Sequence, residues 1–223
     1  MPQLILLHGA LGTRESFGPL ARLLRDDFEL FIPDFKGHGS NNTGSPFTIR
    51  ELSEQVAGLI KTEGLQRPSI FGYSMGGYAA LRMAAETPQL AGAIVTLGTK
   101  FDWSPEVALR ESSILDPEKI TAKVPAFASW LEKLHGTEWK SVCRETAAMM
   151  TGLAESPEID FGKIISPVMI IRGENDALVS EAESRHAADS IPQGSFTTLE
   201  NAPHPLEKVD PNALSHLLKS FFL

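Results

Sequence analysis

The sequence predicts a doubly wound α/β fold, in which an all-parallel sheet of about six strands carries helices on both faces and a small helical cap. Short apolar runs are typical of strands buried on both faces, and they occur near residues 3–8, 28–33, 68–73, 91–97, 167–172 and 195–200. Helical patterns separate most of these runs, and this alternation predicts parallel strands joined by right-handed crossovers. Residues 101–157 break the alternation because they contain helical patterns only.

The helices that alternate with strands have their own local signals. Thr48 and Glu51 have the three-residue separation of a capping box, and so do Ser180 and Glu183. In that motif each side chain bonds the other residue's backbone N–H, so each pair predicts the beginning of a helix. The helical patterns outside the exceptional stretch cover residues 16–25, 48–61, 77–85, 180–190 and 211–222.

A short glycine-flanked motif is the strongest sign of chemistry in the chain. Gly72-Tyr73-Ser74-Met75-Gly76 follows a strand-like run and precedes a helical pattern, which is the context of a nucleophile elbow. Glycines without a Cβ atom let the strand and the helix approach each other. We therefore expect Ser74 in a strained backbone conformation at the N-terminus of a helix, where a developing anion is stabilised. The alternative is a serine that only caps the helix.

A candidate general base follows the last strand-like run. His204 lies on a loop between Pro203 and Pro205, both of which stiffen it. An imidazole titrates near neutrality, so it can remove a proton from Ser74 and return it. The alternative is an ordinary surface histidine.

A candidate acid follows the preceding strand-like run. Asp176 can accept the second imidazole N–H of His204, which would fix its tautomer. Two other carboxylates compete for this role. Glu174 is two residues away and could instead contact the backbone of the turn, and Asp102 follows the strand before. We favour Asp176.

An oxyanion hole needs two backbone N–H groups. The residue after the nucleophile, Met75, would supply one of them. The loop after the first strand would supply the other, from Ala10, with Leu11 as the second choice. His8 begins this loop and is expected to brace it by hydrogen bonding.

Taken together, these residues resemble the α/β-hydrolase superfamily along nearly the whole chain. Besides the elbow, the resemblance includes His8-Gly9, a turn over 34–40 similar to the family's Asp-x-x-Gly-His-Gly-x-Ser, the segment 173–176, and Pro203-His204. It implies a triad in the order Ser74, Asp176, His204. The family's usual sheet has eight strands, so the chain is expected to lack the first two. Asp34 in the similar turn is expected to be architectural.

The resemblance also implies a cap after the fourth strand. We expect a core domain of residues 1–100 and 158–223, with a helical cap of residues 101–157 that roofs the site and excludes water. An apolar stripe on a helix usually packs against a neighbouring element. We therefore expect most of the cap's aromatic residues to pack the cap onto the core domain rather than to contact substrate. The candidates for substrate contact are Leu11, Trp103, Phe127, Trp130 and Met150. The four helical patterns of the cap cover 105–114, 117–123, 125–135 and 138–153.

The expected activity is that of a carboxylesterase-like serine hydrolase, which cleaves a small-molecule ester or thioester through an acyl-enzyme. Two alternatives stay open. One is a lyase or carbon–carbon bond hydrolase, since short capped relatives include both the carboxylesterase of biotin synthesis and a lyase of menaquinone synthesis. The other is a ligand-binding signalling module with a slow triad. The lyase would need cations for its substrate's carboxylates, and the available ones are Arg82, Lys100, Arg110, Lys123 and Arg144.

Composition limits the partners. A net charge of −8 over 223 residues argues against nucleic acid or an anionic membrane surface. Cys143 is the single cysteine, which excludes an intramolecular disulfide and predicts a reducing, cytoplasmic location. Asn41-Asn42-Thr43 matches a glycosylation sequon that such a protein would not use.

No cofactor and no metal are expected. His38, His135, His186 and His216 lack the spacing of metal ligands. The expected partner is a small-molecule substrate, and the expected assembly is a monomer, with a homodimer as the alternative.

Overall fold

The centre of the fold is a parallel β-sheet. The computed structural model describes residues 1–41, 46–155 and 159–223. Within them the sheet has six strands in the order β2-β1-β3-β4-β5-β6, and every neighbouring pair is parallel. The predicted all-parallel sheet is confirmed. The strands are β1 (Gln3–Leu7), β2 (Glu29–Phe31), β3 (Ser69–Tyr73), β4 (Ile94–Leu97), β5 (Val168–Asn175) and β6 (Gly194–Pro203).

Helices begin where the local signals place them. The capping boxes at Thr48 and Ser180 are both formed. The α-helices are α1 (Gly18–Leu24), α2 (Ile49–Thr62), α3 (Met75–Glu86), α4 (Pro105–Ile114), α5 (Pro117–Lys123), α6 (Pro125–His135), α7 (Trp139–Leu153), α8 (Glu181–Ser190) and α9 (Pro211–Phe222). Short 3-10 segments are η1 (Arg14–Phe17), η2 (Gly39–Asn41), η3 (Gly136–Glu138), η4 (Phe161–Lys163) and η5 (Leu206–Lys208).

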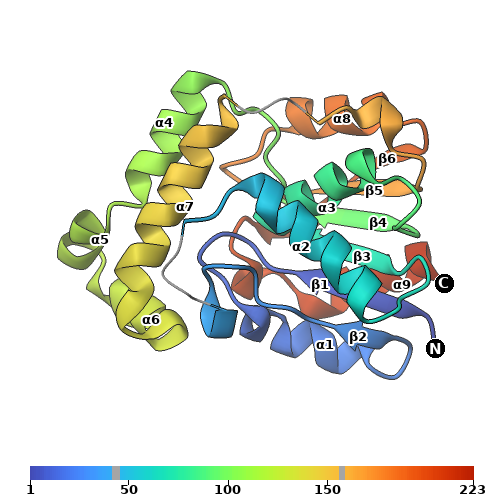
Figure 1. Cartoon of the computed structure of the whole chain (residues 1–223), viewed down its shortest axis with the longest axis horizontal. Helices are drawn as coiled ribbons and strands as arrows, with labels where there is room; N and C mark the ends of the chain where they lie inside the picture. Colours follow the sequence, from blue (N-terminus) through green and yellow to red (C-terminus); the bar gives the residue numbers. More distant parts are fainter. Residues whose placement is uncertain (42–45, 156–158) are drawn as a thin grey trace.

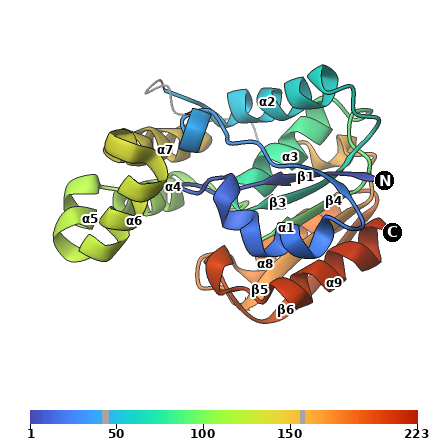
Figure 2. The same ribbon diagram turned by 90° about the horizontal axis from the view of Figure 1, so that it is seen from below.

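Helices cover both faces of the sheet, so its strands are apolar on both sides. In β1, Leu4 and Leu6 join one core cluster with α1 and α9, whereas Ile5 and Leu7 join the other with α2, α3 and α8. All four side chains are fully buried. Figure 2 shows α1 and α9 on one side of the sheet and α2 and α3 on the other.

The strand order reverses between β1 and β3, and ligands of open α/β sheets bind beyond the carboxyl ends of the strands at such a point. The ends of these two strands are neighbours, with Leu7 paired to Gly72. The loop after β1 and the turn after β3 therefore meet at this edge.

Helices α4 to α7, here called the helical insert, lie beyond the same edge (Figure 1). Their predicted helical ranges are confirmed. The insert contributes Leu131, Trp139 and the fully buried Cys143 to a small core cluster that also contains Leu11, from the loop after β1. Its division from the rest of the chain as a separate domain stays a prediction. The proposed boundary at 157/158 lies outside the described residues, as do two residues of the Asn41-Asn42-Thr43 sequon.

The first turn of α3 packs directly on the backbone of β1. A Cβ atom added to Gly76 would collide with the backbone oxygen of Leu7 and lie 2.7 Å from that of His8. Backbone atoms at the centre of a sheet cannot move away cheaply, so this contact requires glycine.

We expect Gly76→Ala to lower the free energy of unfolding by about 3 kcal/mol, because it overpacks a rigid backbone contact. Urea denaturation would measure it. The matched control is Gly58→Ala at an exposed position of α2, where an added Cβ meets nothing within 4 Å. That change should raise the free energy of unfolding by about 0.5–1 kcal/mol. Equal effects of the two substitutions would contradict the packing argument.

Candidate active site

Ser74 occupies the turn between β3 and α3. It has φ 51° and ψ −115°, a strained conformation for a residue other than glycine. Two hydrogen bonds from the end of β4 and the residues just after it hold Ser74: its N–H donates to Leu97 O at 2.9 Å, and Thr99 Oγ1–H donates to its carbonyl oxygen at 3.1 Å. The neighbouring strand β4 thus maintains the strained conformation that the sequence predicts.

His204 and Asp176 converge on this serine from the ends of β6 and β5. Ser74 Oγ lies 3.4 Å from His204 Nε2, and His204 Nδ1 lies 2.8 Å from Asp176 Oδ2. A carboxylate only accepts hydrogen bonds, so Nδ1 carries the proton and the lone pair of Nε2 faces the serine. The structure therefore brings the three predicted residues together in a line.

Asp176 is held as an anion. Its side chain is almost fully buried, and its other oxygen, Oδ1, accepts the backbone N–H groups of Leu178 at 2.8 Å and Val179 at 3.0 Å. Burial raises the pKa of Asp176, but the hydrogen bond and charge of His204 and these two N–H groups outweigh it, so the net pKa lies below its ordinary value. The carboxylate can therefore orient His204 and stabilise a positive charge on it.

The competing carboxylates have other roles. Asp102 is exposed, and its Oδ1 accepts the backbone N–H of Ser104 at 3.1 Å. Glu174 accepts the backbone N–H of Asn201 at 2.8 Å, which braces the segment that leads to His204. Of the three carboxylates considered, only Asp176 bonds His204.

Tyr73 is a residue of the site that the sequence analysis does not single out. Its hydroxyl donates to His204 O at 2.6 Å, and its ring lies 5.5 Å from the imidazole. Burial raises the pKa of Tyr73 above its ordinary value, so the phenol stays protonated and donates. The contact joins residues 131 positions apart, and no local pattern could indicate it.

Two backbone N–H groups beside Ser74 have no acceptor in the described part of the chain. They belong to Met75 and Ala10, the two predicted oxyanion donors, and both residues line the same cavity as Ser74. The second choice, Leu11, is unsuitable because its N–H already donates to His38 Nε2 at 3.3 Å.

His8 braces the loop as predicted. Its Nε2 accepts the N–H of Phe35 at 3.0 Å, and its Nδ1 donates to Gly9 O at 2.8 Å. Burial lowers the pKa of His8 to about 4, so the ring is neutral at pH 7 and can accept one hydrogen bond while it donates the other.

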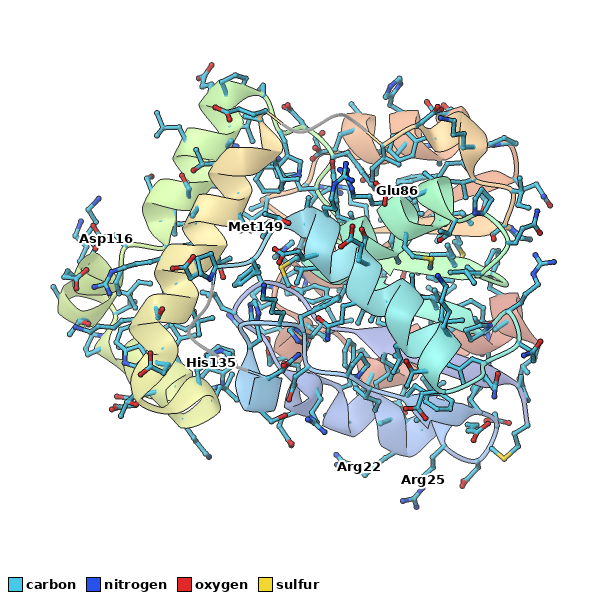
Figure 3. All side chains as sticks on the ribbon, in the orientation of Figure 1. Arg22, Arg25, Glu86, Asp116, His135 and Met149 are labelled. Atoms are coloured by element: carbon cyan, nitrogen blue, oxygen red, sulfur yellow. The ribbon has the colours of Figure 1, made fainter. Side chains whose placement is uncertain are left out.

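A cavity of about 290 Å³ opens beside Ser74 and His204. Leu11, Trp103 and Met150 line it, as predicted for substrate contacts, and Met149 joins them from the face of α7 turned toward the sheet (Figure 3). The wall is mainly apolar. Its two charged residues are Lys100, which donates to Leu178 O at 3.0 Å, and Glu111.

The prediction that Phe127 and Trp130 contact the substrate is wrong, since neither residue lines this cavity. Their rings stack on each other 5.5 Å apart, and Trp130 lines a separate groove of about 280 Å³ beside α1 and α9. Helix α6 buries Ala128 and Leu131 in the core of the insert, and Trp130 packs against the edge of that core rather than on the cavity wall. Helical spacing identifies apolar positions but does not say which neighbour each one meets.

Comparison with known proteins agrees with the fold. A profile of the alpha/beta hydrolase family matches residues 4–214, so the chain belongs to the α/β-hydrolase family. Its homologues include esterases and other hydrolases, which identifies it as a hydrolase of this fold.

Three similar proteins illustrate the family. The pimeloyl-[acyl-carrier protein] methyl ester esterase of Xylella fastidiosa is 27% identical over 219 residues, 86% of this chain and 83% of the esterase. The 2-(acetamidomethylene)succinate hydrolase of Mesorhizobium japonicum is 23% identical, over 99% of this chain and 87% of its own length. A thermophilic esterase from Thermogutta terrifontis shares the fold with a TM-score of 0.80 at 22% identity, covering 100% of this chain and 89% of that one.

The described residues contain no group of three or more His, Cys, Asp or Glu side chains placed to hold a metal ion. In the same ranges, no helix is long and apolar enough to cross a membrane.

Asp34 anchors the turn of residues 34–40, which contacts the segment that follows β1. Its carboxylate accepts the N–H groups of Arg14 and Ser40 at 2.7 and 3.1 Å, and Arg14 Nε at 2.9 Å. Burial raises its pKa, but these hydrogen bonds outweigh burial and lower it from 3.8 to about 2. The lowered pKa shows that the fold favours the charged form.

We expect Asp34→Asn to lower the free energy of unfolding by about 1–3 kcal/mol at pH 7, because charged hydrogen bonds are lost. The folded pKa lies below the unfolded one, so the ionised carboxylate stabilises the fold above about pH 4, and this contribution disappears toward pH 2. Urea denaturation from pH 7 to pH 2 would measure the difference between wild type and variant. A difference that stays constant with pH would contradict a role for the charge.

Proposed function

We propose that the protein is a serine hydrolase that cleaves a small-molecule ester or thioester by acyl transfer. The observation that carries the proposal is the line of Ser74 Oγ, His204 and Asp176, with contacts of 3.4 and 2.8 Å. A nucleophile, its base and the group that orients the base are recognised by this geometry.

The proposed reaction begins when Ser74 Oγ attacks the substrate carbonyl carbon while His204 Nε2 takes the hydroxyl proton. The carbonyl oxygen becomes an anion that would accept hydrogen bonds from the N–H groups of Met75 and Ala10, which have no acceptor among the described residues. The imidazolium then gives its proton to the leaving alcohol or thiol, and the acyl-enzyme forms. Water, deprotonated by the same imidazole, attacks the acyl group and releases the acid and Ser74.

The lining of the cavity favours an uncharged, largely apolar substrate. Its walls are mainly aliphatic and aromatic, and the insert that covers it would limit the access of water to the acyl-enzyme. The side chain of Glu111 is only 10% exposed, and Arg110 bonds one of its two oxygens, Oε1. A carboxylate in the wall disfavours anionic substrate groups.

The same observations argue against the lyase alternative. That reaction would need several cations for carboxylates, and of the five considered only Lys100 lines the cavity. Lys100 is already engaged, with Leu178 O at 3.0 Å and Glu183 Oε1 at 3.6 Å. Hydrolysis of an ester therefore fits the site better. The methyl ester esterase named among the relatives adds support for this class of substrate.

We expect purified wild-type protein to hydrolyse p-nitrophenyl esters between acetate and decanoate, and Ser74→Ala to lower kcat by about 10³-fold or more while the protein stays folded. Release of p-nitrophenol would be followed at 405 nm, and circular dichroism would check the fold. Undiminished hydrolysis by the folded variant would disprove the role of Ser74.

The choice of acid is tested by a matched pair of substitutions. Asp176→Asn should lower kcat about 10²- to 10⁴-fold, because His204 loses the partner that holds its tautomer and stabilises its charge. Asp102→Asn should leave kcat within about twofold, since an exposed carboxylate away from His204 contributes little to the reaction. The proposal for Asp176 fails if the two variants have similar kcat values.

A further inference from the structure

We propose that His135, the last residue of α6 in the helical insert, is a positioning residue for the oxyanion hole. It holds the loop of residues 9–12, here called the oxyanion loop, so that the N–H of Ala10 faces the cavity. This inference rests on the proposed hydrolase function. It adds a link between the insert and the catalytic groups.

The contacts of His135 are specific. Its Nε2 lies 3.0 Å from Leu11 O, and its Nδ1 lies 3.1 Å from the backbone nitrogen of Gly39. A carbonyl can only accept and a backbone N–H can only donate, so Nε2 carries the proton and Nδ1 does not. Figure 3 shows His135 at the junction between α6 and the segment that contains η2. The neutral imidazole therefore joins two segments of the core to the insert.

Leu11 needs such support. It has φ 58°, in the left-handed region that residues other than glycine rarely occupy. Its N–H donates to His38 Nε2, and its carbonyl accepts from His135 Nε2, so histidines restrain the backbone on both sides of its Cα. Conformations of this kind persist where surrounding contacts hold them in place.

The peptide unit between Gly9 and Ala10, one unit before the bond that joins Ala10 to Leu11, carries the proposed oxyanion N–H. Gly9 C=O and Ala10 N–H belong to one planar trans unit, so they point in opposite directions. Gly9 O accepts from His8 Nδ1 at 2.8 Å and from Gly12 N–H at 3.1 Å. These bonds turn the N–H of Ala10 the opposite way. Ala10 is thus fixed from the preceding peptide by His8 and from the following residue by His38 and His135.

The side chain of Leu11 strengthens the link with the insert. It is 5% exposed and belongs to the core cluster that contains Leu131 and Trp139, rather than to the clusters of the sheet. The oxyanion loop is therefore attached to the insert by a buried side chain and by the hydrogen bond from His135. A shift of the insert would move the loop as well.

The three histidines form a continuous buried row. Ring centroids are 5.2 Å apart for His8 and His38 and 5.9 Å apart for His38 and His135. Burial lowers the pKa of all three below the ordinary value, and it outweighs the charge of Asp34, which raises the pKa of each ring. A row of neutral rings suits a place where each imidazole must both donate and accept.

Two substitutions separate the bonds of His135. In His135→Gln, the amide nitrogen takes the place of Nε2 and can still donate to Leu11 O, but the acceptor for Gly39 N–H is lost. In His135→Asn, the amide oxygen takes the place of Nδ1 and can still accept from Gly39, but nothing reaches Leu11 O. Both variants have similar polarity, so they control for each other.

We expect His135→Asn to lower kcat for the best p-nitrophenyl ester about tenfold with KM within about twofold, because a displaced N–H stabilises the transition state less. His135→Gln should keep kcat within about threefold of wild type. Affinity for a phenylboronic acid, which forms a tetrahedral adduct with the serine, should fall in parallel with kcat in the Asn variant. Equal kcat values for the two variants, or a change in KM alone, would overturn the proposal.

A second measurement does not depend on turnover. In ¹H–¹⁵N spectra, His135→Asn should shift the amide signals of Ala10 and Leu11, and His135→Gln should leave both near their wild-type positions. If wild type cleaves no ester of the series, the proposed function fails, and these spectra still decide whether His135 positions the loop. Unshifted signals in the Asn variant would refute the inference on their own.

Discussion

The packing of α3 against the backbone of β1 is the constraint on which the site depends. Gly76 allows this approach, and Ser74 in the preceding turn is therefore presented above the ends of two neighbouring strands. The same contact places the helix N-terminus beside the loop that follows β1. Main-chain packing thus brings together the proposed nucleophile and the proposed oxyanion donors, independently of the side chains of the proposed triad.

Charge at the site is confined to a few places. Asp176 is held ionised beneath His204 by hydrogen bonds that outweigh burial. Near the oxyanion loop, burial keeps the row of His8, His38 and His135 neutral. In the proposed reaction, the negative charge that develops at the substrate carbonyl would meet backbone N–H groups and an imidazole, whereas the two charged residues of the wall, Lys100 and Glu111, are each bonded to another residue. The mostly apolar cavity keeps those interactions in a medium of low polarity.

Much of this could be predicted from the sequence because the informative signals are local. Apolar runs located the strands, capping boxes located the helix starts, and the glycine-flanked Ser74 located the elbow. What the sequence could not give depends on contacts between distant segments. The bond from Tyr73 to His204 O is of this kind. The directions of Phe127 and Trp130 also depend on how α6 meets its neighbours, which spacing within one helix does not determine.

The position of Leu11 in the core of the insert has a consequence for how this protein can change. A replacement insert with other helices would have to refill the space around this leucine as well as shape a new cavity. Variation in the insert and in residues 9–12 should therefore be correlated across relatives. Recombination that exchanges the insert alone would cut through a shared core. The natural unit of exchange is thus the insert together with the loop that it holds.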